Sequence, residues 1–236
     1  MPLVSPVSPL RRSPGAIKAV LFDLFETLVT ESHAAPTRAS SLAPALGLER
    51  QAYRPEWKAR RPRIVVGTLS FADALMEISQ TLGGTLDGHT VQTICQQRVR
   101  EKAEAYARID NQVKTLVAEL AGRQIRLGVI SNGFKEDVLG WPTCSLAPSF
   151  QCTVFSCDEG VAKPDPEIYL RALHRLGLQP EAAIYIGDGG DNELAGAAQA
   201  GLRACRAAWF APSSPASLPW PELTSCGDLL KLVAAG

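Results

Sequence analysis

The 236-residue sequence predicts an α/β protein in which a helical domain is inserted into a core built on a parallel β-sheet. Three observations favour this class. Short apolar runs rich in β-branched residues recur along the chain, helical patterns separate the later runs, and a long stretch after the first run contains only helical patterns. Strands that alternate with helices form parallel sheets that are covered on both faces.

Five apolar runs are the predicted strands. Residues 17–22 (IKAVLF) suit a fully buried parallel strand, and this run ends abruptly at Asp23. The later strands are predicted at 125–130, 152–155 and 183–186, with a weaker one near 203–209. Because ligands bind at the carboxyl ends of the strands in open α/β sheets, polar residues after these runs are expected to mark the active crevice.

Two helical patterns lie between the later strands. The first places four apolar residues on one face, at Val113, Leu116, Val117 and Leu120. Gly122 is expected to close this helix in the left-handed conformation. In the second pattern, Asp165 is the predicted N-cap, Pro166 takes the first helical position and Gly177 ends the helix.

The stretch at 30–110 contains no convincing strand. Its apolar residues fall on helix faces, at Phe71, Ala74, Leu75, Ile78 and Leu82 and again at Val91, Ile94, Cys95 and Val99. We therefore predict a helical domain at 30–110 and a core made of 16–29 and 111–236. The Pro- and Ser-rich residues 1–15 are predicted to be a flexible tail.

Composition excludes several classes of partner. The 24 basic and 24 acidic residues leave no net charge, so neither nucleic acid nor an anionic membrane is a predicted partner. The apolar runs are far shorter than a membrane span, and the first fifteen residues lack the apolar core of a signal peptide, which makes the cytoplasm the predicted location. The six cysteines form no CxxC pair and no Cys/His cluster, which predicts buried or partly buried thiols.

Four polar residues follow successive strand-like runs: Asp23, Ser131, Lys163 and Asp188. A carboxylate at a strand end can act as a nucleophile, and a second carboxylate can share a Mg²⁺ ion with it. A lysine can neutralise a phosphate, while a hydroxyl and backbone N–H groups can hold the remaining oxygens. Each residue alone is compatible with a helix cap, a turn or a solvated loop. Together and in this order, they predict an active site.

Four segments carry a resemblance to a known family. They are DLFETL from Asp23, VISNG around Ser131, SCDEGVAKPDPEIY around Lys163 and GDGGDNELAGA around Asp188. In this order, they resemble the four motifs of the haloacid dehalogenase superfamily, over nearly the whole chain from about residue 17. The resemblance implies a Rossmann-like parallel sheet core. It also implies that the helical insert is that superfamily's first-type cap, which closes over the active site as a lid.

The resemblance implies roles for individual residues. Asp23 is the nucleophile, and Ser131 and Lys163 complete the catalytic set. The substrate-binding residues that it implies are Thr27, Asn132 and Gly133. In the superfamily's pattern, Mg²⁺ is held by Asp23, by the backbone carbonyl of Phe25 and by Asp188.

Phe25 departs from the phosphatase pattern. Phosphatases of the superfamily usually carry a second Asp at this position, which protonates the leaving oxygen and then activates water. Phe25 can do neither, and such acid–base help is worth about 10²–10⁴-fold. The haloacid dehalogenases carry an aromatic residue there, so Phe25 points to carbon–halogen chemistry. Glu26 is the nearest other acid.

Asp188, together with Glu193 at a position where the family often has an Asp, favours a metal-dependent phosphatase instead. Dehalogenases work without metal, and their corresponding loop lacks the metal-binding acid that Asp188 supplies. Their caps tend to carry a Trp-Arg pair, where this sequence has Trp57-Lys58, and a lysine is not equivalent to an arginine. The favoured prediction is therefore a Mg²⁺-dependent phosphohydrolase that acts on a small, anionic, phosphorylated metabolite.

Two alternatives stay open. One is a metal-independent 2-haloacid dehalogenase, and the other is a catalytically weak or non-enzymatic binding protein of the same fold. The sequence predicts neither the substrate nor the oligomeric state. Within the predicted cap, Arg60, Arg61 and Arg63 either form a solvated face or hold an anionic substrate.

Overall fold

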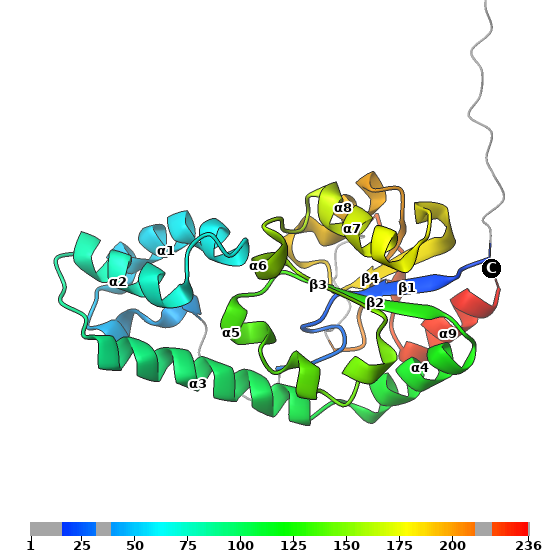
Figure 1. Cartoon of the computed structure of the whole chain (residues 1–236), viewed down its shortest axis with the longest axis horizontal. Coiled ribbons are helices and arrows are strands. Elements are labelled where there is room, and N and C mark those ends of the chain that lie inside the picture. Colours follow the sequence, from blue (N-terminus) through cyan, green and yellow to red (C-terminus); the bar gives the residue numbers. More distant parts are fainter. Residues whose placement is uncertain (1–15, 32–38, 211–218, 236) are drawn as a thin grey trace, which may run out of the picture.

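The computed structural model describes residues 16–31, 39–210 and 219–235. The predicted flexible tail at 1–15 lies outside the described residues. A parallel sheet with helices on both faces forms the core, and a group of helices extends beyond one end of it (Figure 1). The predicted α/β class with a Rossmann-like parallel sheet is therefore confirmed.

Six parallel strands form the sheet in the order β3-β2-β1-β4-β5-β6. They are β1 (Ala19–Phe22), β2 (Arg126–Ser131), β3 (Cys152–Phe155), β4 (Ala183–Gly187), β5 (Arg203–Ala207) and β6 (Glu222–Leu223). All residues of β1 and β4 are buried, as expected for central strands that are covered on both faces. The five predicted strands are confirmed. β6 was not predicted, because it has only two residues and Glu222 is exposed.

Helices cover both faces of the sheet (Figure 1). Those of one face are α4 (Asn111–Gly122) and α9 (Cys226–Ala234), and those of the other are α7 (Pro166–Leu176) and α8 (Glu193–Gln199). Val20 and Phe22 of β1 pack into the first layer, and Ala19 and Leu21 pack into the second. This alternation is the two-residue period of a strand, and it buries β1 from both sides.

The predicted ends of α7 are confirmed. Asp165 caps its start by accepting a hydrogen bond from the N–H of Glu167 at 2.9 Å. Gly177 follows its last residue with a φ of 63°, in the left-handed region that glycine adopts without strain. The segment that leads into α7 carries Lys163, so this N-cap helps to fix the direction from which that side chain enters the site.

The prediction for Gly122 was wrong. It is the last helical residue of α4, and the left-handed residue is Gln124, with a φ of 59°. The N–H of Ile125 donates to the carbonyl of Leu120 at 3.1 Å. This closing bond spans five residues and places the left-handed turn immediately before Ile125, so the reversal falls on Gln124 rather than on the glycine.

The described residues between 39 and 110 form helices and turns but no strand. The helices are α1 (Arg50–Val65), α2 (Phe71–Thr81) and α3 (Gly88–Ala107), preceded by 3₁₀ turns at Ala39–Ser41 and Ala43–Leu46. Their apolar side chains form a separate cluster around Tyr53, Trp57 and Phe71, to which Phe134 of the core contributes. Figure 1 shows α1 and α2 beyond one end of the sheet, with α3 leading back to the core. The boundaries of this region as a cap domain stay a prediction.

Two further expectations concern burial. Within the part of the chain that the structure describes, no helix is both long and apolar enough to cross a membrane. All six cysteines are free thiols. Four of them are buried, namely Cys144, Cys152, Cys205 and Cys226, and the other two are partly buried, which confirms the predicted burial.

Candidate active site

The register of the sheet brings three predicted site residues to one edge. Asp23 directly follows β1, whose last residue pairs with Val129 in β2 and with Ile186 in β4. Ser131 and Asp188 each lie two residues beyond those partners. Because neighbouring strands are about 4.8 Å apart, the three residues stand side by side at the carboxyl end of the sheet. Asp23 is in the middle, and its N–H donates to the Ile186 carbonyl at 2.8 Å.

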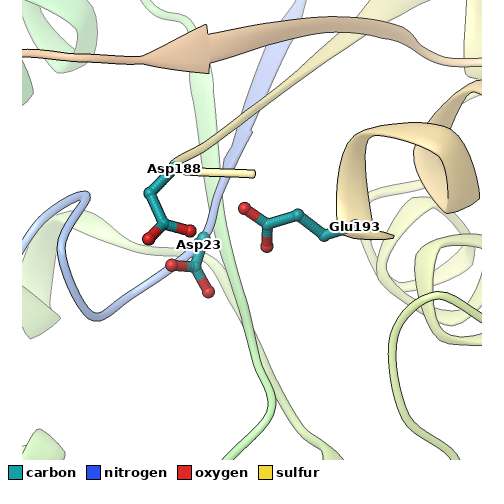
Figure 2. A group of neighbouring side chains, drawn as sticks. All are labelled: Asp23, Asp188 and Glu193. Carbon is teal, nitrogen blue, oxygen red and sulfur yellow. The ribbon is translucent and has the colours of Figure 1, made fainter. Parts of the chain in front are cut away.

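Three carboxylates converge at this edge. Asp23, Asp188 and Glu193 each offer an oxygen, and these oxygens lie within 4.8 Å of one another. Figure 2 shows the three side chains approaching from different parts of the fold: the loop after β1, the loop after β4 and the start of α8. Asp23 and Glu193 are buried and Asp188 is half-buried. Like charges at this spacing repel, so the cluster requires positive charge nearby.

Lys163 supplies one positive charge. Its Nζ contacts Asp23 Oδ1, lies 2.5 Å from Glu193 Oε2 and 3.1 Å from the hydroxyl of Tyr185. The side chain of Lys163 is only 3% exposed. A Cβ on Gly196 of α8 would lie 2.2 Å from the carbonyl oxygen of Pro164. Only glycine therefore lets α8 pack so closely against the segment that carries the lysine.

Glu193 is a site residue that the sequence placed in the acidic fourth motif without giving it a specific role. Its carboxylate accepts hydrogen bonds from Lys163, from the Tyr185 hydroxyl at 2.6 Å and from the Gly189 N–H at 3.0 Å. A Cβ on Gly187 would lie 2.1 Å from Glu193 Oε1, so the glycine makes room for this carboxylate. The signal in the sequence is a glycine at the strand end, followed by an acid at the first position of the next helix.

Burial and charge set the ionisation of the cluster. Burial raises the pKa of Asp23 to about 7; Lys163 opposes this shift and Glu193 adds to it. Burial lowers the pKa of Lys163, but the carboxylates of Asp23 and Glu193 outweigh it and hold that pKa above its ordinary value. Burial also raises the pKa of Asp188. Asp23 and Glu193 thus share one ammonium, and a further cation beside Asp23 and Asp188 would favour the ionised forms of these two carboxyl groups.

The other predicted residues surround this cluster. The hydroxyl of Thr27 donates to Asp23 Oδ2 at 3.3 Å. The Asn132 side chain brackets the Lys163 backbone, accepting from its N–H at 2.8 Å and donating to its carbonyl at 2.9 Å. Gly133 donates its N–H to the Ser156 hydroxyl at 3.2 Å, and Ser131 is buried. Asn132 therefore positions the loop of Lys163, in addition to any contact with substrate.

A cleft of about 360 Å³ opens beside these residues, between the core and the helical insert. Three of its residues are aromatic (Phe25, Trp57 and Phe134), three are basic (Arg61, Arg98 and Lys102) and three are acidic (Glu31, Glu101 and Asp137). Phe25 is half-buried, and the Lys102 Nζ lies 3.8 Å from the centre of its ring. The cleft is therefore lined by both aromatic and charged side chains.

Two predicted candidates have other partners. Glu26 accepts hydrogen bonds from the Thr30 hydroxyl at 3.1 Å and from the Glu31 N–H at 2.8 Å, so its carboxylate is held within its own turn. In the arginine run, Arg60 pairs with acids of the insert itself. Arg61 instead lines the cleft and pairs with Asp191 of the core at 3.1 Å. A single arginine of the run thus reaches the cleft and bridges to the acidic loop.

The sequence model of the haloacid dehalogenase-like hydrolases matches residues 17–201 of the chain. The chain belongs to this family. The match spans β1 to α8 and therefore includes Asp23, Ser131, Lys163 and Asp188. The predicted family is confirmed.

Known relatives of this hydrolase include enzymes of two chemistries. It is 32% identical over 118 residues to a phosphoserine phosphatase of Thermus thermophilus, a match that covers 46% of each chain. Its fold resembles a 2-haloacid dehalogenase from Pseudomonas syringae pv. Tomato DC3000 with a TM-score of 0.64 and 26% identity, over 93% of this chain and 99% of that one. It also resembles a phosphatase of the family from Thermococcus onnurineus, with a TM-score of 0.64 and 21% identity, over 92% and 98%. The sequence match thus spans less than half of the curated relative's length.

Proposed function

We propose that this hydrolase is a Mg²⁺-dependent phosphohydrolase that uses Asp23 as its nucleophile and acts on a small phosphorylated metabolite. The observation that carries the proposal is the placement of the Asp188 carboxylate within 4.8 Å of the Asp23 and Glu193 carboxylates, with a buried lysine beside them. A carbon–halogen hydrolase needs no second acid at this point. The likeness to phosphatases in sequence supports the same chemistry.

The residues present fit a Mg²⁺ ion. Mg²⁺ prefers oxygen ligands and is commonly bound by one or two carboxylates together with water and substrate oxygens. Asp23 and Asp188 would hold it, together with the backbone carbonyl of Phe25. Glu193 is less available, because Lys163, Tyr185 and a backbone N–H already bond to it. The bound ion supplies positive charge that neutralises the phosphoryl oxygens.

The side chains of the chain carry the chemistry. Asp23 attacks the phosphorus, forms an aspartyl-phosphate and releases the leaving group. Lys163 and Thr27 hold the two oxygens of the Asp23 carboxylate in fixed directions, which reduces the entropy lost on attack. Ser131 and the backbone N–H of Asn132 stabilise the phosphoryl oxygens, since the N–H of Gly133 is already donated to the Ser156 hydroxyl. Water then cleaves the aspartyl-phosphate, without help from a carboxylate at position 25.

The aromatic side of the cleft favours the second candidate, a 2-haloacid dehalogenase. Phe25, Trp57 and Phe134 line a part of the cleft that would exclude water from a halide. Arg61 and Arg98, which line the same cleft, would bind a carboxylate. Against this, the acid at Asp188 has no task in metal-free dehalogenation. The cap's motion as a lid and a non-catalytic binding role both stay untested predictions.

A parallel assay tests the proposal. A panel of phosphate esters and anhydrides and 2-chloropropionate are each incubated with the protein, with Mg²⁺ or with EDTA. We expect release of phosphate that requires Mg²⁺, and no release of chloride. Chloride release that persists in EDTA, with no phosphate release in either condition, would overturn the proposal and establish the dehalogenase.

Mg²⁺ binding is expected to release protons and to be about tenfold tighter at pH 8 than at pH 6. Because burial raises the pKa of Asp23 to about 7, a proton competes with the ion for this carboxylate below pH 7 and not above it. Calorimetric titration with Mg²⁺ in two buffers of different ionisation heat measures both the affinity and the protons released. Asp188→Asn should weaken binding at least roughly tenfold at both pH values.

Asp191→Asn is the matched control for this titration. Asp191 lies in the same loop, but it bonds to Asn132 and Arg61 and is not one of the three converging carboxylates. Its replacement should leave Mg²⁺ affinity within about threefold of wild type, since Asp191 is exposed and its charge is already paired with Arg61. An affinity that is the same at both pH values and insensitive to Asp188→Asn would contradict the metal assignment.

Phe25→Asp is expected to raise phosphatase turnover by up to about 10²-fold, the lower bound for general acid–base catalysis. The new carboxylate activates the water that cleaves the aspartyl-phosphate, and the backbone carbonyl that would hold the metal is unchanged. The gain will be smaller if the partly buried site raises the pKa of the new carboxyl. Turnover is measured under steady-state conditions for both substrate classes.

Phe25→Leu is the control, because it removes the ring without adding a base. It should give no gain in phosphatase turnover. In a dehalogenase the same Asp substitution would repel a 2-haloacid and abolish turnover. The proposal would be overturned if Phe25→Asp lost dehalogenase activity while wild type, Phe25→Asp and Phe25→Leu all lacked phosphatase activity.

A further inference from the structure

The cleft beside the nucleophile offers no carboxylic acid to the leaving group. Phe25 and Asn132 belong to the loops that carry Asp23 and Ser131, and both line the cleft. A group released from a phosphoryl at Asp23 therefore departs into this space. The Phe25 ring lines the cleft and donates no proton. The neighbouring acid, Glu26, is held in its own turn by two hydrogen bonds.

The acids in the cleft walls are already paired. Glu31 lies 2.6 Å from the Lys102 ammonium, and Asp137 lies 2.7 Å from Arg98. The third acid, Glu101, accepts a hydrogen bond from the side chain of Gln97 at 2.9 Å. Each of the three carboxylates is thus already engaged by another side chain and is not presented to a leaving group. Of the two other acids near the nucleophile, Asp188 is assigned to the metal, and Glu193 already accepts hydrogen bonds from Lys163, Tyr185 and the Gly189 N–H.

The group that stands above position 25 is a cation. Lys102 extends from α3, its side chain is 9% exposed, and its Nζ lies 3.8 Å from the centre of the Phe25 ring. The ammonium is thus held between the Glu31 carboxylate and the face of the Phe25 ring. The ammonium donates to Glu31 and lies 3.9 Å from Asp137 Oδ1, and because Lys102 lines the cleft, its remaining hydrogens can be donated to a group bound there. At this point the chain therefore has an ammonium, paired with Glu31, where the phosphatase pattern has an acid.

We propose that the substrate carries an acidic leaving group, as in an acyl phosphate or a phosphoric anhydride, and that Lys102 stabilises the anion as it departs. This inference rests on the proposed phosphohydrolase function. An alkoxide leaves poorly without a proton, whereas a carboxylate or a phosphate leaves readily as an anion. The site that lacks a general acid is thus matched to a substrate that needs none.

The proposed hydrolysis needs no co-reactant other than water. An oxygen of the Asp23 carboxylate forms a bond to phosphorus, and the bond between phosphorus and the leaving oxygen breaks. The electron pair of that bond stays on the departing oxygen, next to the Lys102 ammonium. Water then attacks the aspartyl-phosphate, which gives inorganic phosphate, restores the Asp23 carboxylate and releases one proton to solvent.

A substrate series tests the inference on the wild-type protein with Mg²⁺. Acetyl phosphate, pyrophosphate, glycerol phosphate and aryl phosphates of graded leaving-group acidity are compared. We expect kcat/KM to rise steeply with the acidity of the leaving group and to be at least about 10²-fold higher for the better of the two anhydrides than for glycerol phosphate. Because all substrates share the same slow aspartyl-phosphate breakdown, kcat should be similar among the good ones and preceded by a burst of leaving group.

The outcomes separate the two proposals. A flat series, with glycerol phosphate hydrolysed as fast as the anhydrides, would overturn the inference and leave the phosphohydrolase standing. No phosphate release from any member would remove the phosphohydrolase and this inference with it. The ratio of acetyl phosphate to pyrophosphate hydrolysis tells which kind of anhydride the cleft accepts.

Lys102→Met tests the role of the cation. Its kcat/KM for acidic leaving groups should fall roughly 10- to 100-fold, because one charge-assisted contact is lost, and the dependence on leaving-group acidity should become steeper. Lys102→Arg keeps the charge and should retain most of the activity. Lys135→Met is the matched control, since Lys135 also pairs with a carboxylate at 2.6 Å but is exposed and does not line this cleft. An equal loss for every substrate with Lys102→Met would show a structural role and overturn the assignment of Lys102.

Discussion

Replacing Asp23 with Asn is expected to lower turnover by at least about 10⁴-fold while leaving the fold intact. An amide oxygen does not form the covalent intermediate. Asn has nearly the same size, and Lys163 keeps its contact with Glu193 at 2.5 Å, so the lysine stays paired. Because burial raises the pKa of Asp23 to about 7, its ionised form is not a large source of stability that the variant would lose. Steady-state turnover and thermal unfolding are measured together.

Asp191→Asn is again the matched control, because it makes the same chemical change one loop away from the nucleophile. Asp191 bonds to Asn132 and Arg61 and should change turnover by no more than about tenfold. A phosphate mimic such as beryllofluoride should bind tightly to the wild-type protein and weakly to Asp23→Asn. If Asp23→Asn kept wild-type turnover, the nucleophile would have to be sought elsewhere.

The sheet could be predicted because its strands are uniform in character. β1 and β4 are buried along their whole length, so a short apolar run is the expected pattern for each. β6 escaped prediction because a two-residue edge strand with an exposed glutamate has no such pattern. The end of α4 was misjudged for a related reason. The hydrogen bond that places the left-handed turn at Gln124 depends on where the next strand begins, and a glycine nearby is no guide to that.

Part of the candidate site could also be predicted, since topology alone brings strand ends together. Asp23, Ser131 and Asp188 each follow a strand of the same parallel sheet, and their proximity requires nothing more. Glu193 is different. Its contact with Lys163 depends on the close approach of α8, which Gly187 and Gly196 permit. Side-chain direction at a helix start is set by packing, so the sequence left its role open.

The walls of the cleft could not be predicted from sequence. Lys102 and Phe25 are 77 residues apart, and their contact depends on how α3 returns to the core. Arg61 pairs with Asp191, which lies 130 positions later in the sequence, while its neighbour Arg60 pairs with an acid of the insert. The arginine run alone does not distinguish these two outcomes. Substrate selection therefore rests on the packing of the insert against the core, which no motif encodes.

Lys163→Met is expected to lower the free energy of unfolding by about 3–5 kcal/mol in EDTA at pH 8, and to abolish measurable turnover. The substitution keeps the length of the side chain but leaves the Asp23 and Glu193 carboxylates buried together without the ammonium between them. Unpaired and buried, the Asp23 carboxyl, whose pKa burial already raises, then binds a proton more strongly in the folded state than in the unfolded one. The lost stability should therefore return partly as the pH is lowered from 8 to 5, since the folded state takes up the proton. Chemical denaturation at both pH values measures this.

Two comparisons isolate the buried charge as the cause. Lys163→Met combined with Glu193→Gln removes one of the two carboxylates and should recover part of the stability but none of the turnover. Lys135→Met breaks an exposed pair with Asp158 and should cost less than about 1 kcal/mol at either pH. A Lys163→Met protein as stable at pH 8 as the Lys135→Met protein would mean that the two carboxylates do not depend on the ammonium. The cluster would then have to be neutralised by protons, and the case for a cation between Asp23 and Asp188 would lose its electrostatic basis.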